Sequence, residues 1–386
     1  MSLTNIMGLL GGLALFLYGM QMMSQGLENA AGNKMQQILE KLTANRFLGV
    51  LVGALITAVI QSSSATTVMV VGFVNAGMMT LNQAVWIIMG ANIGTTITGQ
   101  LIALDAGAVA PIIAFIGVIL IIFSKKEKIG YVGSILAGLG ILFIGMDMMG
   151  GSMEPLAQSQ SFISLLTKFS NPILGILAGT IFTAIIQSSS ASVGILQALA
   201  GSGIVTLDSA AFILFGQNIG TCITAFLAAL GANRNAKRTT IIHITFNVIG
   251  TIIFTILCIT TPLIPVLQGM TESAPKQIAN LHTMFNVTTT LILLPFGTAL
   301  TKLAQHILPD PKTGEPVQGQ IGHLQTKNSD VLGMASITLE ETKRKLEDML
   351  LLAEQNVHSS YDVFLQCDRN VFQQIEKREE QVDEQP

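Results

Sequence analysis

The stretch Gln61-Ser62-Ser63-Ser64 lies between two apolar segments and recurs as Gln187-Ser188-Ser189-Ser190. The two copies are offset by 126 residues (187 minus 61), and the same offset without gaps aligns much of the flanking sequence. For example, Gly90-Ala91-Asn92-Ile93-Gly94-Thr95 falls on Gly216-Gln217-Asn218-Ile219-Gly220-Thr221. A gapless match of this extent indicates a tandem duplication, so the sequence predicts two related halves.

The composition is that of an integral membrane protein. Of the 386 residues, 50% are hydrophobic and only 11% are charged, against about 25% in soluble domains. Asp105 is the only charged residue between Arg46 and Lys125. Such uncharged stretches must be surrounded by lipid or by other membrane helices. The small net charge of −3 gives no reason to expect a nucleic-acid partner.

The apolar pattern predicts an all-α membrane domain. A transmembrane helix needs about 20 apolar residues. The flanks of each QSSS sequence, such as Phe47–Ile60, have only about 14 residues, which is typical of a re-entrant hairpin. Each half is therefore predicted to contain three transmembrane helices and one re-entrant helical hairpin that carries QSSS. The predicted spans are 6–26, 82–104 and 108–123 in the first half, 129–150, 208–230 and 238–260 in the second, and one extra C-terminal span at 277–305.

Lysine and arginine are distributed unevenly between the predicted loops. The chain is predicted to lie in the cell (inner) membrane. The positive-inside rule predicts that its N-terminus is on the outer side and that its C-terminal tail is cytoplasmic. Because each half has an odd number of full spans, the halves are predicted to have opposite orientations. Such inverted-topology repeats are found in many secondary transporters. The predicted parts are repeat 1 at 1–126, inverted repeat 2 at 127–260, an additional transmembrane helix at 261–308, a linker at 309–328 and a helical tail at 329–386.

The turn of each hairpin predicts an anion site. A helix begins there, so its first N–H groups lack partners and the helix dipole adds partial positive charge. Serine is a preferred N-cap, and such a terminus binds an oxyanion without lysine or arginine. Small residues also allow close helix packing, but two serine clusters at matched positions favour a ligand site. The candidate anion ligands are Gln61, Ser62, Ser63, Ser64, Gln187, Ser188, Ser189 and Ser190.

Neutral oxygens near these turns are candidates for a coupling cation. Interrupted membrane helices expose carbonyl oxygens that bind Na+, and the two Gly-X-Asn-Ile-Gly-Thr sequences are interpreted as a second pair of interruptions. No other metal and no cofactor is expected. His243 and His282 are expected to cap or pack. The candidate sodium ligands are Thr57, Thr66, Asn92, Thr95, Thr183, Ser192, Asn218 and Thr221.

The paired QSSS segments, each followed by Gly-X-Asn-Ile-Gly-Thr, resemble the type II sodium–phosphate cotransporters and their bacterial relatives over roughly residues 1–305. The resemblance implies inorganic phosphate as substrate, Na+ as driving ion and a substrate site where the two hairpins meet. After the third serine the two halves differ: the first continues Ala-Thr-Thr and the second Ala-Ser-Val. This difference leaves the number and location of the Na+ sites undecided. The tail from Ser329 resembles the start of a PhoU-like domain; a solvated or dimerising amphipathic helix is the alternative.

The predicted function is Na+-coupled phosphate symport by alternating access, through an elevator-like or rocking movement. The alternatives are a Na+-coupled transporter of another small oxyanion and a passive anion channel. An enzyme is not expected, because a serine nucleophile needs an adjacent base and the chain has no Gly-X-Ser-X-Gly elbow. The expected partners are phosphate, Na+ and the lipid bilayer, and a homodimer is left open.

Overall fold

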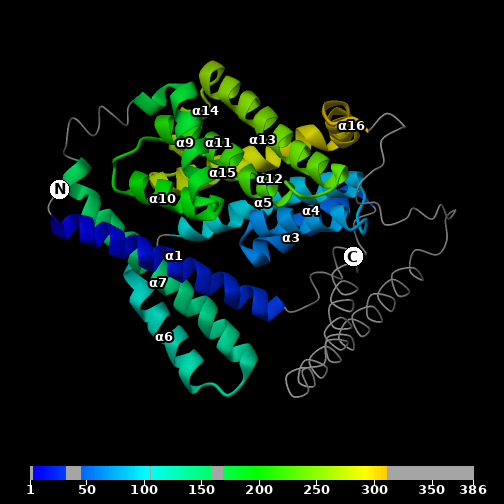
Figure 1. Cartoon of the computed structure of the whole chain (residues 1–386). Helices are drawn as coiled ribbons and strands as arrows, with labels where there is room; N and C mark the ends of the chain where they lie inside the picture. The colour runs from blue at the N-terminus through cyan, green and yellow to red at the C-terminus, as the bar shows by residue number, and fades with distance from the viewer. Residues whose placement is uncertain (1–2, 32–44, 105, 158–167, 311–386) are drawn as a thin grey trace, which may run out of the picture. The chain divides into compact units, whose positions relative to one another are not determined.

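The computed structural model describes residues 3–31, 45–104, 106–157 and 168–310 (Figure 1). Within these ranges every regular element is a helix, which confirms the all-α prediction. The chain divides into two units, 1–315 and 316–386, and the described residues all belong to the first. The predicted PhoU-like tail at 329–386 and most of the linker lie outside the described residues.

The helices of the first half are a long helix, a broken pair, a second long helix and a short one. They are α1 (Leu3–Ala31), α3 (Arg46–Ile60), α4 (Ser63–Asn75), α5 (Leu81–Ile102), the one-turn η1 (Gly107–Val109) and α6 (Ala110–Phe123). The remaining helices are α7 (Glu127–Ala157), η2 (Lys168–Ser170), α9 (Pro172–Ile186), α10 (Ser189–Gly201), α11 (Leu207–Gly220), α12 (Cys222–Ala228), α13 (Arg234–Thr260), α14 (Leu263–Met270), α15 (Ala274–Leu293), η3 (Leu294–Phe296) and α16 (Gly297–Ile307).

Six helical stretches among the described residues are long and apolar enough to cross a membrane. They correspond to six of the seven predicted spans. The seventh, 108–123, lies in the helical stretch Gly107–Phe123, which is apolar but shorter than the six. The first half therefore contributes two of the six long helices and one shorter apolar helix at its third predicted span. The six stretches are Leu3–Ala30, Leu81–Ile102, Glu127–Met153, Leu207–Ala228, Arg234–Thr260 and Ala274–Ile307.

Each QSSS sequence forms a two-residue turn between two helices. The glutamine has a left-handed backbone, with φ of 58° at Gln61 and 60° at Gln187, and its N–H donates to the threonine carbonyl four residues earlier at 2.7 Å. The next serine is extended and caps the following helix: Ser62 Oγ accepts from the N–H of Ala65 at 3.1 Å. A non-glycine residue in the left-handed region costs about 1 kcal/mol or more. Because both glutamines adopt this conformation at equivalent positions, the turn geometry is a shared feature of the two halves.

Glycines bring the first helix of each broken pair against the following long helix. A Cβ at Gly90 of α5 would lie 2.0 Å from the carbonyl oxygen of Val50 in α3. The equivalent Cβ at Gly216 of α11 would lie 2.0 Å from the carbonyl oxygen of Ile176 in α9. The offset of 126 residues therefore relates tertiary contacts as well as sequence, and each half holds its QSSS turn against a long helix in the same way.

The long helices α1 and α7 pack antiparallel through glycines. A Cβ at Gly12 would meet the carbonyl oxygen of Gly145 at 2.8 Å, and one at Gly19 would meet that of Gly138 at 2.6 Å. As the residue number rises in α1 it falls in α7, so the helices run in opposite directions. The 126-residue offset places Gly12 on Gly138 and Gly19 on Gly145. The offset therefore relates the contact between Gly12 and Gly145 to the contact between Gly138 and Gly19.

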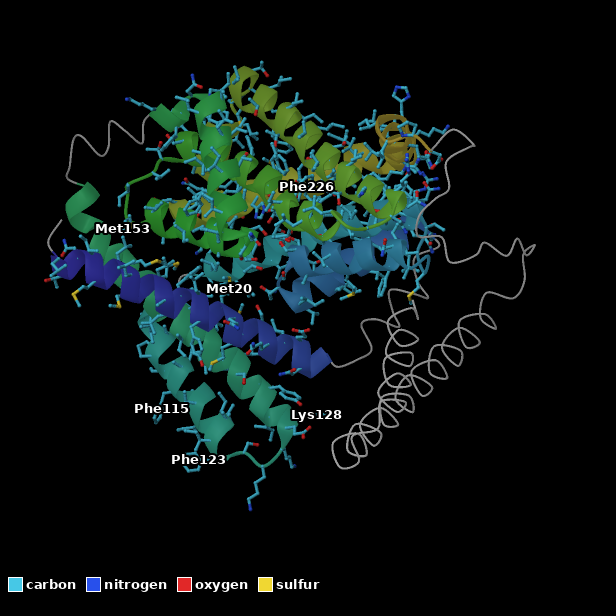
Figure 2. The ribbon with its side chains drawn as sticks, in the orientation of Figure 1. Met20, Phe115, Phe123, Lys128, Met153 and Phe226 are labelled. Carbon is cyan, nitrogen blue, oxygen red and sulfur yellow. The ribbon has the colours of Figure 1, made fainter. Side chains whose placement is uncertain are left out.

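Apolar side chains cover the outer faces of these helices. In Figure 2, Phe115 and Phe123 project outward from α6, and both are exposed, at 64% and 77%. Soluble proteins rarely expose contiguous apolar patches of this kind. Together with the six long apolar helices, these side chains indicate a multi-pass membrane protein.

Candidate functional site

The two QSSS turns meet in space. Ser63 Oγ lies 3.4 Å from Ser189 Oγ, and both side chains are buried. Ser190 Oγ donates to the carbonyl oxygen of Gln61 at 3.3 Å and lies 3.4 Å from Thr98 Oγ1. Because Ser63 and Ser189 occupy equivalent positions, the N-termini of α4 and α10 converge on one point from the two halves.

This convergence concentrates donors and positive potential. The first N–H groups of α4 and α10 have no acceptor within their own helices. Each terminus carries about half an elementary positive charge, so the pair supplies about one. Hydroxyls of Ser63, Ser64 and Ser189 add further donors next to these N–H groups, whereas that of Ser190 already donates to Gln61. The arrangement can bind a small oxyanion through hydrogen bonds.

A cavity of about 310 Å³ opens at the converging turns. Of the eight predicted anion ligands, Ser63 reaches the site through its contact with Ser189, and Gln187 is exposed and does not line the cavity. The face of α1 that carries Gln21, Ser24 and Gln25 forms another wall. The predicted anion ligands that line the cavity are Gln61, Ser62, Ser64, Ser188, Ser189 and Ser190.

The two glutamines of the turns have different environments. Gln61 is buried: its Oε1 accepts from Thr98 Oγ1 at 2.7 Å, and its Nε2 donates to the carbonyl oxygen of Ala58. The side chain of Gln187 is exposed, and Thr224, the equivalent of Thr98, donates instead to a carbonyl of its own helix. Thr98 is a site residue that sequence reasoning missed. Its match to Thr224 in the repeat was the available signal.

The predicted sodium ligands of the first half are hydrogen-bonded to protein groups. Thr57 Oγ1 donates to Thr66 Oγ1 at 2.9 Å. Asn92 Nδ2 and Thr95 Oγ1 donate to carbonyls four residues earlier in α5, at 2.8 and 3.1 Å. Helix α5 is continuous through these residues, so the predicted interruption at Asn92–Thr95 is wrong. The flanking Gly90 allows the close approach of α3 and does not break the helix.

The second half leaves the corresponding oxygens without partners. Thr183 and Ser192 are the equivalents of Thr57 and Thr66, and their hydroxyls, both fully buried, have no hydrogen-bond partner among the described residues. Gln217 Nε2 donates to the carbonyl oxygen of Ser192 at 3.0 Å, while its Oε1 is also without a partner in the described chain. Gln217 was missed by sequence reasoning. It stands where the first half has Ala91.

Asn218 and Thr221 lie at the junction of α11 and α12. The helix is interrupted only at Thr221, whose hydroxyl donates to the carbonyl oxygen of Gln217 at 2.9 Å. Asn218 Oδ1 lies 3.1 Å from His282 Nε2, which belongs to α15. His282 was expected to cap or pack; it is buried and contacts a predicted sodium ligand. His243 is also buried, and its ring nitrogens have no partner among the described residues.

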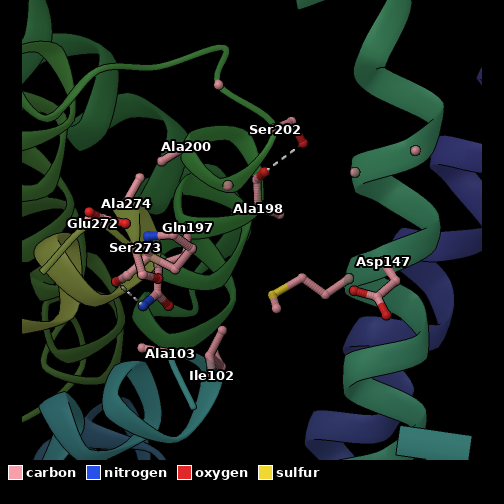
Figure 3. Close-up of a pocket in the computed structure, with 16 residues that line it drawn as sticks. Ile102, Ala103, Asp147, Gln197, Ala198, Ala200, Ser202, Glu272, Ser273 and Ala274 are labelled. Carbon is pink, nitrogen blue, oxygen red and sulfur yellow. Dashed lines mark hydrogen bonds between the residues drawn. The ribbon is translucent and has the colours of Figure 1, made fainter. Parts of the chain in front are cut away.

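A second cavity, of about 810 Å³, lies between α7 on one side and the ends of α10 and α15 on the other (Figure 3). The buried amide of Gln197 donates to the carbonyl oxygens of Gly99 and Pro275, both at 3.0 Å. The α7 wall is made of the repeat equivalents of four α1 residues that line the first cavity. None of the QSSS serines lines this second cavity. The α7 residues are Met146, Asp147, Gly150 and Gly151, and their α1 equivalents are Met20, Gln21, Ser24 and Gln25.

Comparison with known proteins matches the duplicated architecture. The sequence pattern of the Na+/Pi-cotransporter family matches the chain twice, over residues 15–151 and 145–263. The chain belongs to the Na+/Pi-cotransporter family. Each match contains one QSSS turn and the long helix packed on it. Family membership points to a transporter and not to an enzyme.

Relatives within the Na+/Pi-cotransporter family include bacterial and animal proteins. Uncharacterized protein YqeW of Bacillus subtilis is 32% identical over 295 residues, which cover 76% of this chain and 95% of that protein. The protein named "Putative inorganic phosphate export protein YjbB" in Salmonella typhimurium is 26% identical over 336 residues, 87% of this chain and 60% of that protein. Human sodium-dependent phosphate transport protein 2B is 38% identical over 98 residues, 25% of this chain and 14% of that protein. No solved structure matches the chain.

Proposed function

We propose that this protein is a secondary active transporter that couples Na+ movement to the transport of inorganic phosphate across the cell membrane. The observation that carries the proposal is the contact between Ser63 and Ser189, which joins two helix N-termini at one cavity. Phosphate would bind there through serine hydroxyls and first-turn N–H groups. The family and the names of the relatives support phosphate over other oxyanions of similar size.

The charge at the site supports a coupling cation. Two helix N-termini supply about one positive charge, whereas phosphate carries one to about two negative charges near neutral pH. Among the described residues that line the first cavity there is no lysine or arginine, and Glu28 adds a carboxylate. Bound Na+ would neutralise the remaining charge, and neutral oxygens at interrupted helices are suitable ligands for it.

The two halves are proposed to lie in the membrane in opposite orientations, with each QSSS hairpin entering and leaving on the same side. The antiparallel packing of α1 on α7, which occupy equivalent places in the repeat, supports this inversion. The first cavity extends along the C-terminal half of α1, which packs near Tyr131 at the start of α7. That end of the pair adjoins Lys125 and Lys126, which lie between α6 and α7. It also carries Lys128, in the first turn of α7 (Figure 2). By the positive-inside rule, this cavity would face the cytoplasm.

The two cavities support a mechanism of alternating access. The serines line only the first cavity, while the equivalent face of α7 lines the second. An elevator-like or rocking movement of the paired hairpins would exchange these roles and expose the serines on the other side of the membrane. A passive channel would need both cavities to reach the serines at once.

Transport in proteoliposomes tests the proposed function. Uptake of labelled phosphate is expected to require an inward Na+ gradient and to saturate with phosphate concentration. Uptake that is unchanged when K+ replaces Na+ would refute the coupling, and uptake that does not saturate would favour a channel. Because one relative is named an export protein, the gradient is also reversed in preloaded vesicles to measure efflux.

The unpartnered oxygens of the second half predict an asymmetry in Na+ binding. Thr183→Val is expected to raise the Na+ concentration for half-maximal uptake by about tenfold, because a buried hydroxyl without a protein partner is available to the cation. The matched Thr57→Val should shift this value much less, since the hydroxyl of Thr57 already donates to Thr66. The Na+ dependence of phosphate uptake measures both. Equal shifts in the two variants would contradict a Na+ site confined to the second half.

A further inference from the structure

A single face of α1 lines the first cavity together with the QSSS turns. Gln21, Ser24, Gln25 and Glu28 all line the cavity. Their spacing of three and four residues places them on one side of the helix. Among the described residues that line the cavity, Glu28 is the only one with an ionisable side chain. The QSSS turns therefore supply hydrogen-bond donors to the cavity, and α1 supplies one carboxylate, that of Glu28.

The serine wall and Glu28 have opposite hydrogen-bonding capacity. First-turn N–H groups and serine hydroxyls donate to the unprotonated oxygens of an oxyanion, whereas an ionised carboxylate only accepts. Phosphate near neutral pH keeps at least one P–OH group, which can donate to a carboxylate in a strong, charge-assisted hydrogen bond. Sulfate is fully deprotonated and has no hydrogen to donate. Against sulfate, Glu28 would place a negative charge beside unshared electron pairs.

We propose that Glu28 is a specificity-determining residue, which accepts a hydrogen bond from the protonated oxygen of phosphate and excludes oxyanions that have no proton. The inference rests on the proposed function and identifies which anions that site takes. Discrimination of this kind relies on a repulsive element against the wrong ligand as well as on attraction to the right one. Helix dipoles and serine hydroxyls alone would bind sulfate by the same interactions.

The test compares two competitors of labelled phosphate uptake in proteoliposomes of the full chain. Arsenate, like phosphate, keeps a proton near neutral pH, and sulfate does not. In the wild type, arsenate should compete and sulfate should not. In Glu28→Gln, whose amide can donate to sulfate, sulfate should compete at least about tenfold better, with arsenate competition nearly unchanged. Glu28→Asp should keep part of the exclusion, and the matched control Glu127→Gln, outside the cavity, should keep all of it.

The outcomes separate the two proposals. If the wild type shows no Na+-dependent phosphate uptake, the proposed function and the role of Glu28 both fail. If the wild type transports phosphate and Glu28→Gln still excludes sulfate as strongly, only the role of Glu28 fails. A Glu28→Gln variant that changes the Na+ requirement alone would show that the carboxylate attracts the cation and does not select the anion.

Discussion

Replacement of Ser189 by alanine is expected to weaken phosphate binding by about tenfold or more while leaving the protein folded and membrane-inserted. The hydroxyl of Ser189 is buried, lies 3.4 Å from Ser63 Oγ and lines the first cavity. A lost hydrogen bond to a charged ligand typically costs about 1.5–3 kcal/mol, and each 1.4 kcal/mol is about a factor of ten in affinity. Ser63→Ala should have a similar effect, because Ser63 is the equivalent residue at the same contact.

The KM for phosphate in proteoliposomes measures this loss, and size-exclusion chromatography in detergent checks folding. Ser134→Ala is the matched control, since Ser134 Oγ donates to a carbonyl of its own helix and lies away from both cavities. Unchanged transport in both Ser63→Ala and Ser189→Ala would mean that the serines serve helix packing. Loss of transport in Ser134→Ala as well would mean that the assay reports stability.

Replacement of Gly179 by alanine is expected to prevent correct assembly of the second half. A Cβ at this position would lie 1.9 Å from the carbonyl oxygen of Ile213, so α9 and α11 would have to separate. Backbone shifts of this kind cost about 1–3 kcal/mol or more, which is a large fraction of the stability of an ordinary domain. Gly53 occupies the equivalent position against Ile87, at 2.3 Å, and should be nearly as sensitive.

The yield of monodisperse protein and its thermal unfolding measure this effect. Gly72→Ala is the control, because no atom lies within 4 Å of the added Cβ, and a helical alanine is about 0.5–1 kcal/mol more favourable than glycine. Gly72→Ala should therefore leave the melting temperature equal or slightly higher. A Gly179→Ala protein as stable as the wild type would contradict the close approach of α9 and α11.

The parts of the fold that follow from local chemistry were predictable from the sequence. The short flanks of QSSS predicted a re-entrant helical hairpin in each half. The structure has two short helices joined by a turn at Gln61 and again at Gln187, and their entry into a membrane stays a prediction. The helix interruption predicted at Asn92–Thr95 was wrong, because a glycine can either break a helix or allow a second helix to approach closely. Gly90 was interpreted as a helix-breaking residue, but it admits the backbone of α3, a partner that only the tertiary structure identifies.

The candidate site was predictable only as far as the repeat is symmetric. The resemblance to the sodium–phosphate cotransporters implied that the two QSSS turns meet, and Ser63 contacts Ser189. The symmetry of the repeat could not distinguish buried Gln61 from exposed Gln187. Gln61 accepts a hydrogen bond from Thr98, whereas the equivalent Thr224 donates to the carbonyl oxygen of Thr221. The sequence difference between Thr66 and Ser192 was visible, but the proximity of Gln217 to Ser192 required the fold.

The self-paired contact between Ser63 and Ser189 has a consequence for the history of the gene. A residue that touches its own equivalent contributes the same atom from both sides, as in a symmetric homodimer. A chain of half this length would supply one serine, and a second copy inserted in the opposite direction would supply the other. In such a dimer of half-length chains both serines of the proposed anion site would already be present, and fusion of the two copies would let each half diverge. The pairs Ala91 and Gln217, and Thr66 and Ser192, are such divergences.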